Sequence, residues 1–461
     1  MNTPTIENTN NWSKEEFGGA ILKNKKRTDR LVLIAKRVAE GASGQVAELF
    51  HSVAEREGAY KFLENDRIKA LQVAKSSHLA CARRCAKEKF VFVPVDGSTL
   101  SIDDSSDCKD LGPTGPKGMG SGLEAMSAIA IRSDGTPLGI CGQIFWARKK
   151  GQKVKHTRKK RGLAEKETRY WLDAITQVED VFEKETPSCK RWYQLDRGGD
   201  FAEMLAWTSE CKSYVTIRAS QNRKLDDPDA NLLWKSFEHC PVLGSYSLKV
   251  LARRGRQERV ATLEVSSKTV NIKLPKKIDR EAQTVTLNAV RVIERDTVPK
   301  DEKAIEWLLL TNYPVNSFDD ARLVIYGYSQ RWKIEEFHKS WKSVCKVEEI
   351  QLRKHEGILK LATLLSAVAM RVERLKYLAR TSPDLPANAE FSRYEIDALI
   401  VLRKPKGYQR GDIPPIGEVV RWAADLGGYV GKSSGGPPGT IVLGRGLYNL
   451  REAANLMEAL S

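Results

Sequence analysis

The sequence of 461 residues lacks several features of membrane, secreted and zinc-binding proteins. Its best apolar run, residues 361–370, lies between Lys360 and Arg371 and is far shorter than the roughly 20 residues of a membrane-spanning helix. The first residues are polar, so no signal peptide is expected. The eight cysteines form no CxxC pair. This pattern predicts a cytoplasmic chain with reduced, buried thiols rather than a disulfide or zinc framework.

Positive charge is what the chain has in excess. Its 76 basic and 59 acidic residues leave a net charge of +17. Such a surplus indicates a polyanionic partner, and nucleic acid is favoured over an anionic membrane because no amphipathic anchor is evident. The length predicts two or three domains.

One stretch near residue 330 places a carboxylate among cations. At about 100° per residue, five side chains fall within roughly an 80° sector of one helix: Tyr328, Arg331, Glu335, Lys339 and Lys342. The opposite, apolar side of that helix comprises Ile334, Phe337, Trp341 and Val344. This face suits phosphate chemistry, with Glu335 on a metal ion and the cations on a nucleic-acid backbone. An ion-paired, solvated helix face has the same pattern.

The order of the other predicted elements indicates an α/β fold. Strands are predicted at 90–95, 128–131 and 138–146, the last two joined by the turn at Asp134-Gly135. A helix near 165–182 and a strand at 191–195 follow, which is the order of a ribonuclease H-like core. Asp96 and Asp196 therefore each stand at the carboxyl end of a predicted strand, where functional residues of α/β folds gather.

A β-rich segment separates Asp196 from Glu335 and predicts an insertion into the core at about 205–320. Its strand patterns cover 214–219, 245–252, 259–265, 269–274 and 284–293. Basic helices are expected near the N-terminus at 27–40 and 45–56, and an amphipathic helix at 446–460 ends the chain. Two segments are expected to be loops: the glycine-rich 112–122 and the basic 149–161, which is either a solvated loop or a DNA contact.

Six motifs, in order, resemble those of the bacterial cut-and-paste DDE transposases of the insertion-sequence-four family, in particular the transposon-five type. They are RTDRL (27–31), EGAYKFL (57–63), VDGST (95–99), LDRGGD (195–200), IEWLLLT (305–311) and YSQRWKIEEFHKSWK (328–342). The last contains the complete Y-x2-R-x3-E-x6-K signature of the family. Gly198 and Gly199 depart from the bulkier residues usual in this type, so a looser turn is expected after Asp196.

The resemblance implies a catalytic and metal-binding triad of Asp96, Asp196 and Glu335. Three carboxylates can hold two Mg²⁺ ions, with Mn²⁺ as a substitute, so that one ion activates the attacking oxygen and the other stabilises the leaving oxygen. Family behaviour implies nicking at the transposon end, a hairpin intermediate, hairpin opening, and joining of the 3′ ends to target DNA.

The resemblance also implies which residues contact DNA. Trp307 would stack on a flipped base with Trp332 beside it, although Trp307 could equally be a core aromatic. The phosphate contacts would be Tyr328, Arg331, Lys339, Lys342 and Arg218, and transposon ends would be recognised by Arg27 and Arg30 in the N-terminal domain. His338 lies at metal-ligand spacing from Glu335, but a structural hydrogen bond is favoured for it.

Three regions are expected. They are a helical end-binding domain (1–70), a ribonuclease H-like catalytic domain (71–370) and a helical dimerisation domain (371–461). The expected function is that of a DNA transposase, an endonuclease that also joins strands, acting on double-stranded DNA as a homodimer at the bacterial nucleoid. The alternatives are a catalytically silent, repurposed transposase that binds DNA, and a general endonuclease or resolvase of the same fold.

Overall fold

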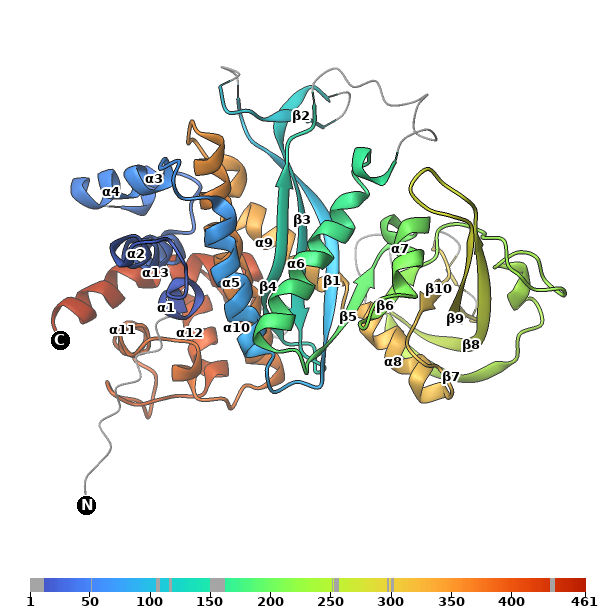
Figure 1. The fold of residues 1–461 in the computed structure, drawn as a ribbon. Helices are drawn as coiled ribbons and strands as arrows, with labels where there is room; N and C mark the ends of the chain where they lie inside the picture. The colour runs from blue at the N-terminus through green and yellow to red at the C-terminus, as the bar shows by residue number, and fades with distance from the viewer. Residues whose placement is uncertain are drawn as a thin grey trace.

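The computed structural model describes residues 12–50, 52–104, 108–115, 118–149, 162–250, 252, 257–296, 298–299, 302–431 and 436–461. Figure 1 shows the central strands between a group of N- and C-terminal helices on one side and the β-rich segment on the other. The predicted basic run, 149–161, lies outside the described residues from position 150 on, so its role as a loop or DNA contact stays a prediction.

The central strands have the order of a ribonuclease H-like core, as predicted. Strands β4-β3-β1-β5-β6 lie side by side, with β1, β5 and β6 parallel and β3 and β4 antiparallel to their neighbours. Their bounds are β1 Phe90–Ser101, β3 Gly120–Ile131, β4 Pro137–Trp146, β5 Lys190–Leu195 and β6 Tyr214–Arg218. Helix α6 (Arg169–Glu185) connects β4 to β5 across one face of this sheet.

The β-rich segment continues the same sheet. Strand β10 (Glu306–Thr311) pairs antiparallel with β6, and β9 (Gln283–Glu294), β8 (Arg259–Leu274) and β7 (Val242–Val250) follow in that order. The prediction of two strands at 259–265 and 269–274 was wrong, because β9 pairs with β8 along its length and makes it one continuous strand. Helix α7 (Ala202–Thr208) lies between β5 and β6 in the chain.

Alternation along β1 separates two cores. Val91, Val93 and Val95 face the core that α6 covers, whereas Phe92 faces the other core. That second core is covered by α8 (Phe318–Ser329), α9 (Trp332–Ser343) and α10 (His355–Thr381). Trp192 on β5 faces this same core. Asp96 and Asp196 each follow one of these residues, Phe92 and Trp192, by four positions. Because side chains alternate between the faces of a sheet, both carboxylates are directed toward the α9 side.

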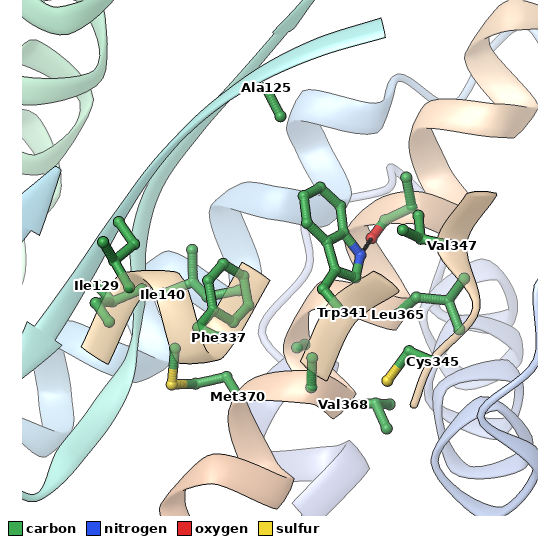
Figure 2. Close-up of a cluster of buried hydrophobic side chains, with 14 of the residues drawn as sticks. Ala125, Ile129, Ile140, Phe337, Trp341, Cys345, Val347, Leu365, Val368 and Met370 are labelled. Carbon is green, nitrogen blue, oxygen red and sulfur yellow. Dashed lines mark hydrogen bonds between the residues drawn. The ribbon is translucent and has the colours of Figure 1, made fainter. Parts of the chain in front are cut away.

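Helix α9 is held on the sheet by its apolar side, as predicted. Ile334, Phe337 and Trp341 are fully buried, and Figure 2 shows Phe337 and Trp341 packed between strand residues such as Ile140 and residues of α10 such as Met370. The Trp341 indole donates a hydrogen bond of 3.1 Å to the backbone carbonyl of Ala362. Val344, predicted to belong to this side, is only half-buried.

The N-terminal region is helical, with one difference from the prediction. Its helices are α1 Trp12–Phe17, α2 Lys25–Gly41, α3 Val46–Leu49, α4 Val53–Leu63 and α5 Ala70–Arg84. The single helix predicted at 45–56 is instead divided between α3 and α4, because Phe50 is extended and buries its ring in the core.

The C-terminal helices surround a core of their own. They are α11 Arg393–Arg403, α12 Ile416–Leu426 and α13 Thr440–Ala459. Helix α13 begins at Thr440 rather than at the predicted 446. Gly444 and Gly446, which weaken the helical pattern in the sequence, are packing positions: a Cβ at Gly446 would lie 1.7 Å from the carbonyl oxygen of Ala423. Both glycines thus allow α13 to approach its neighbours closely.

Two smaller predictions need correction. The segment 112–122, expected to be a loop, contains strand β2 (Gly112–Thr114) and the start of β3, which pair antiparallel. The cysteines were expected to be buried, but Cys108 is exposed and Cys211 and Cys240 are half-buried. Within the described ranges, none of the helices has the length and apolar character needed to cross a membrane.

Candidate active site

The three predicted carboxylates come from separate segments of the chain. The parallel pairing of β1 with β5 ends at Val95 and Leu195, and Asp96 and Asp196 follow directly. The prediction that Asp96 ends its strand was wrong: β1 runs on to Ser101 because it stays paired with β3. Glu335 lies in the first turn of α9, which packs on β1.

Asp196 is held by the turn that follows it. Its Oδ1 accepts a hydrogen bond of 2.7 Å from the Gly198 amide, so that it caps the short 3-10 turn Arg197–Gly199. The looser turn expected here is instead tight. A Cβ at Gly199 would lie 2.7 Å from the Cβ of Leu195, so glycine allows the turn to fold back on the strand.

Arg331 joins two of the three carboxylates. Its Nη1 lies 3.1 Å from Asp96 Oδ2, and its Nη2 pairs with Glu335 Oε1. The side chains of Arg331 and Asp96 are 14% and 20% exposed, and that of Glu335 is 36% exposed, so the pair with Asp96 is the more shielded from water. The arginine was predicted to bind DNA phosphate; in this structure its guanidinium pairs with Asp96 and Glu335 and balances part of their negative charge.

The pKa of Asp96 reports the crowding of negative charge. Burial, followed by the negative charge of Asp196, raises the pKa of this carboxyl to about 6, although Arg331 and the Gly97 amide act in the opposite direction. The Gly97 amide donates to Asp96 Oδ1 at 2.8 Å. Asp96 and Asp196 are therefore close enough to repel each other, which is the electrostatic setting that a divalent cation relieves.

The residues fit a divalent cation by their chemistry. They offer only hard oxygen donors, the ligands preferred by Mg²⁺ and Mn²⁺, and their negative charge is incompletely balanced. Their present arrangement is that of an ion pair: across the described residues, no group of three or more His, Cys, Asp or Glu side chains is placed so that it could hold a metal ion. Arg331 would have to release Asp96 and Glu335 for both carboxylates to bind metal.

This crowding leads to a testable titration. In protein freed of metal with EDTA and labelled with ¹³C at aspartate, the Asp96 carboxyl is expected to titrate near pH 6. Asp196→Asn should lower that midpoint, because a neighbouring negative charge is removed, yet leave it above the ordinary 3.8 because burial remains. An ordinary midpoint would contradict the burial of Asp96, and a raised midpoint that Asp196→Asn does not move would show that the two carboxylates do not interact.

A second group of predicted residues lies beside the carboxylates. The Tyr328 side chain is buried, which raises its pKa, and it interacts with Arg218, Arg331 and Asp196. The ring of half-buried Trp307 meets the Tyr328 ring edge to face at 5.1 Å between centroids. Arg218 ends β6 and donates a hydrogen bond of 3.1 Å to the Glu306 carbonyl. The structure thus brings Trp307, Tyr328 and Arg218 together next to the carboxylates.

The signature does not form one continuous helix. Tyr328 belongs to α8, and a turn at Gln330 and Arg331 separates it from α9. The prediction that five residues share one helix face was therefore wrong. The turn places Arg331 at the start of α9, from which its side chain reaches both Asp96 and Glu335.

The remaining predicted DNA contacts of the signature, Lys339, Lys342 and Trp332, have different surroundings. Lys339 is exposed. Lys342 Nζ donates a hydrogen bond of 2.5 Å to the Thr99 carbonyl and lies 3.8 Å from Glu348, so it is engaged within the protein. Trp332 is 56% exposed and its ring is accessible from solvent.

His338 is directed into the core rather than toward the carboxylates. It is buried, and its ring lies 5.2 Å from the ring of Phe337. Burial lowers its pKa to about 3. No hydrogen-bond partner for its Nε2 is found among the described residues, so neither the metal contact nor the structural hydrogen bond considered from the sequence is observed there.

The N-terminal candidates Arg27 and Arg30 lie apart from this group. Both are on α2, which packs on α1, α4, α10 and α13. Arg27 donates to the Leu22 carbonyl at 3.5 Å, and the Arg30 guanidinium occupies the space beside Gly58 of α4. Both side chains are half-buried.

One buried acid near the site was not singled out in the sequence. Glu124 of β3 lies opposite Thr99 and accepts a hydrogen bond of 2.8 Å from its hydroxyl. Arg148 lies 2.8 Å from the same carboxyl group. The Glu124 carboxyl is buried, and this burial raises the pKa of Glu124. A glutamate within an otherwise apolar strand was the signal that could have identified it.

A groove of about 1240 Å³ lies elsewhere, between α7 and the β8–β9 hairpin. None of the three carboxylates lines it. Its lining includes four lysines: Lys166, Lys224, Lys273 and Lys277.

Both ends of the chain match transposase families. Residues 9–68 match the family described as Transposase DNA-binding, and residues 367–459 match the Transposase Tn5 dimerisation domain. Among solved structures, the cryo-EM structure of the piggyBac transposase synaptic complex with hairpin DNA is similar over 80% of this chain and 76% of that chain. Its identity is 10% and its TM-score 0.38. A likeness this weak does not establish a shared mechanism.

Proposed function

We propose that the chain is a Tn5-like transposase that cuts and joins DNA with Asp96, Asp196 and Glu335, because one end matches a transposase DNA-binding domain and the other a Tn5 dimerisation domain. The observation that carries this proposal is that these three carboxylates, which come from separate segments of the chain, lie close enough to interact. All three belong to the part of the sequence between the two matched regions. DNA binding and a homodimer follow from the two matches; the reaction steps and the residue roles below are proposals.

The carboxylates are proposed to act as metal ligands. Two divalent ions, Mg²⁺ or Mn²⁺, would activate the attacking oxygen and stabilise the leaving oxygen of the phosphodiester. The protein's own part is to hold Asp96 and Asp196 on adjacent strands and Glu335 on the helix that packs over them. Arg331 is proposed to leave its ion pairs when DNA arrives and to bind a phosphate with two donors.

Trp307, Tyr328 and Arg218 are proposed to shape the DNA beside the cut. A hairpin tip requires an unstacked base, and stacking that base on an aromatic ring offsets much of the free energy of unstacking. Trp307 is half-buried next to Tyr328 and can offer part of its ring, and Trp332 is exposed enough to assist. Arg218, Lys339 and Lys342 would contact phosphates on either side, which for Lys342 requires it to leave the Thr99 carbonyl.

The remaining regions are proposed to serve end recognition and assembly. Residues 1–70, including Arg27 and Arg30, would bind the terminal repeat, residues 71–370 would carry out the reaction, and residues 371–461 would pair two copies. The paired complex would then join the 3′ ends to target DNA. A reaction on chromosomal DNA would place the protein at the bacterial nucleoid.

The second candidate is a catalytically silent transposase that binds DNA. The observation that favours it is the engagement of Asp96 and Glu335 by Arg331, which occupies both carboxylates with ion pairs. The two candidates share end binding and differ only in whether the bound DNA is cut.

One experiment separates these candidates. A labelled duplex carrying the element's own terminal repeat is incubated with the protein and Mg²⁺, with EDTA in place of metal, and with the Glu335→Ala variant as a control for contaminating nuclease. We expect a nick and then a hairpin product only with metal and wild-type protein. Specific binding of the repeat without any cut product would contradict catalysis and support the silent candidate. Equal cutting of a scrambled repeat would instead indicate a general endonuclease.

A further inference from the structure

Behind the helix that carries Glu335 lies a buried polar group that the proposed reaction does not use. It comprises Ser340 on α9, Glu373 and Lys376 on α10, and Thr440 at the start of α13. Ser340 and Glu373 are 2% exposed and Lys376 is 5% exposed, whereas Thr440, at the edge of the group, is half-buried. We name these four residues the buried polar bridge.

One carboxylate stands at the centre of the bridge. Oε1 of Glu373 accepts a hydrogen bond from the Ser340 hydroxyl and another, of 2.9 Å, from the Thr440 hydroxyl. Its Oε2 pairs with the ammonium group of Lys376, which also donates to Thr440 Oγ1 at 3.3 Å. A single oxygen atom thus takes hydrogen bonds from α9 and from α13.

The bridge holds the side of α9 that faces away from Glu335. Ser340 follows Glu335 by five residues, which places it about 140° around the helix. A neighbouring contact holds the same helix: Glu336 accepts a hydrogen bond of 2.6 Å from the Tyr377 hydroxyl. Lys333 Nζ lies 3.5 Å from the centre of the Tyr377 ring. With Trp341 packed on α10 (Figure 2), these contacts set the rotation of α9 about its axis.

Helix α13 also contacts α9 through close packing. A Cβ at Gly444 would lie 2.3 Å from the Cγ1 of Val344, just beyond the end of α9. Among the described residues, Glu373 Oε2 has the ion pair with Lys376 but no hydrogen bond, so the hydrogen bonds of Oε1 are the ones that depend on the placement of α9 and α13. A buried charge that loses such a partner is strongly destabilised, which favours one relative placement of α9, α10 and α13. A displacement of α13 would leave Glu373 without one of its partners.

We propose that Glu373 is a positioning residue that couples the seating of α13 to the orientation of α9, and through it to the position of Glu335. Thr440 and α13 lie within the region that matches the dimerisation domain. Joining two copies through this region would then influence the placement of Glu335. The consequence for catalysis rests on the proposed function, whereas the coupling between helices does not.

The coupling is tested by hydrogen exchange of the backbone amides of α9, residues 332–343. The variants are Thr440→Val, Glu373→Gln and both together, in the full-length protein. The matched control is Thr363→Val: this threonine is buried on α10, and within the described part of the chain its hydroxyl bonds to the carbonyl of Leu359 in its own helix and to no other helix. Thr440→Val is expected to speed exchange in α9 by about tenfold, a typical size for the coupling between contacting residues. The double variant should not exceed the larger of the two single effects, because both changes break the same bridge.

A catalytic readout accompanies the exchange measurement. At saturating DNA, Thr440→Val should slow single-turnover cleavage while the Kd for the terminal repeat stays unchanged. The coupling is overturned if α9 exchange in Thr440→Val equals that of Thr363→Val, or if the double variant shows the product of the single effects. Should the wild-type protein cut no DNA, the proposed function fails, but the exchange result still decides the coupling.

Discussion

Asp196→Asn is expected to reduce cleavage of the terminal repeat by about 10³-fold or more, because metal-assisted charge stabilisation in the transition state is worth several kcal/mol. The fold should survive this change. Asparagine can still cap the turn at Arg197–Gly199, since its side-chain oxygen can accept the bond from the Gly198 amide. The measurement is the single-turnover rate at saturating DNA, with the Kd for the repeat and the unfolding midpoint determined alongside. Binding should be retained, because a negative charge near the DNA backbone has been removed.

Asp200, four residues further on, provides a contrasting control. Its buried carboxylate pairs with Arg223 and accepts hydrogen bonds from the Ser220 and Gln221 amides, at 2.7 and 3.0 Å. Asp200→Asn leaves Arg223 without its ionic partner, so it should lower the free energy of unfolding by about 3–5 kcal/mol. The rate that remains in the folded fraction should be changed much less than in Asp196→Asn. If Asp196→Asn loses stability and Asp200→Asn loses only rate, the roles assigned to these two aspartates are reversed.

Trp307→Ala is expected to impair hairpin formation selectively. Stacking of a base on an aromatic ring is worth about 1–3 kcal/mol, so the hairpin step should slow by about 5- to 150-fold while the first nick proceeds. Trp307→Phe, which keeps a ring beside Tyr328, should recover part of the rate. The measurement is the ratio of nicked to hairpin product over time.

The DNA itself offers a control for this prediction. A duplex that lacks the base at the position to be flipped has no stacking energy to lose, so wild-type protein and Trp307→Ala should form hairpins on it at similar rates. A persistent defect on that duplex would mean that Trp307 acts by supporting Tyr328 within the protein. If Trp332→Ala slows the hairpin step and Trp307→Ala does not, the exposed Trp332 is the stacking residue.

Much of the central fold could be predicted because its signals are local. The alternation of Val91, Phe92 and Val93 marks β1 directly, and the turn at Asp134-Gly135 joins β3 to β4. The order of strands and helix then leads to the ribonuclease H-like sheet. Strand β10 could not be placed this way, because its pairing with β6 joins segments about 90 residues apart in the chain.

The errors share a physical cause, which is that contacts made at a distance override the local pattern. The spacing of Tyr328, Arg331 and Glu335 is helical, yet the chain turns at Gln330. Gly444 and Gly446 weaken a helix in isolation but allow α13 to approach α9 and α12. In both cases the free energy of packing against neighbouring elements exceeds the small local preference.

The sequence by itself determined which residues are candidates for the chemistry: Asp96 and Asp196 after buried strand segments, and Glu335 within the signature. Only the tertiary structure decided how these residues are placed relative to one another and which charged groups they contact. Register between parallel strands sets Asp96 beside Asp196, and the turn before α9 brings Arg331 between Asp96 and Glu335. The energy of a Coulombic interaction depends on the distance between the charges in space. Spacing along the chain gives that distance only within a single helix or strand. The ion pairs of Arg331 and the buried bridge behind α9 are therefore properties of the folded chain.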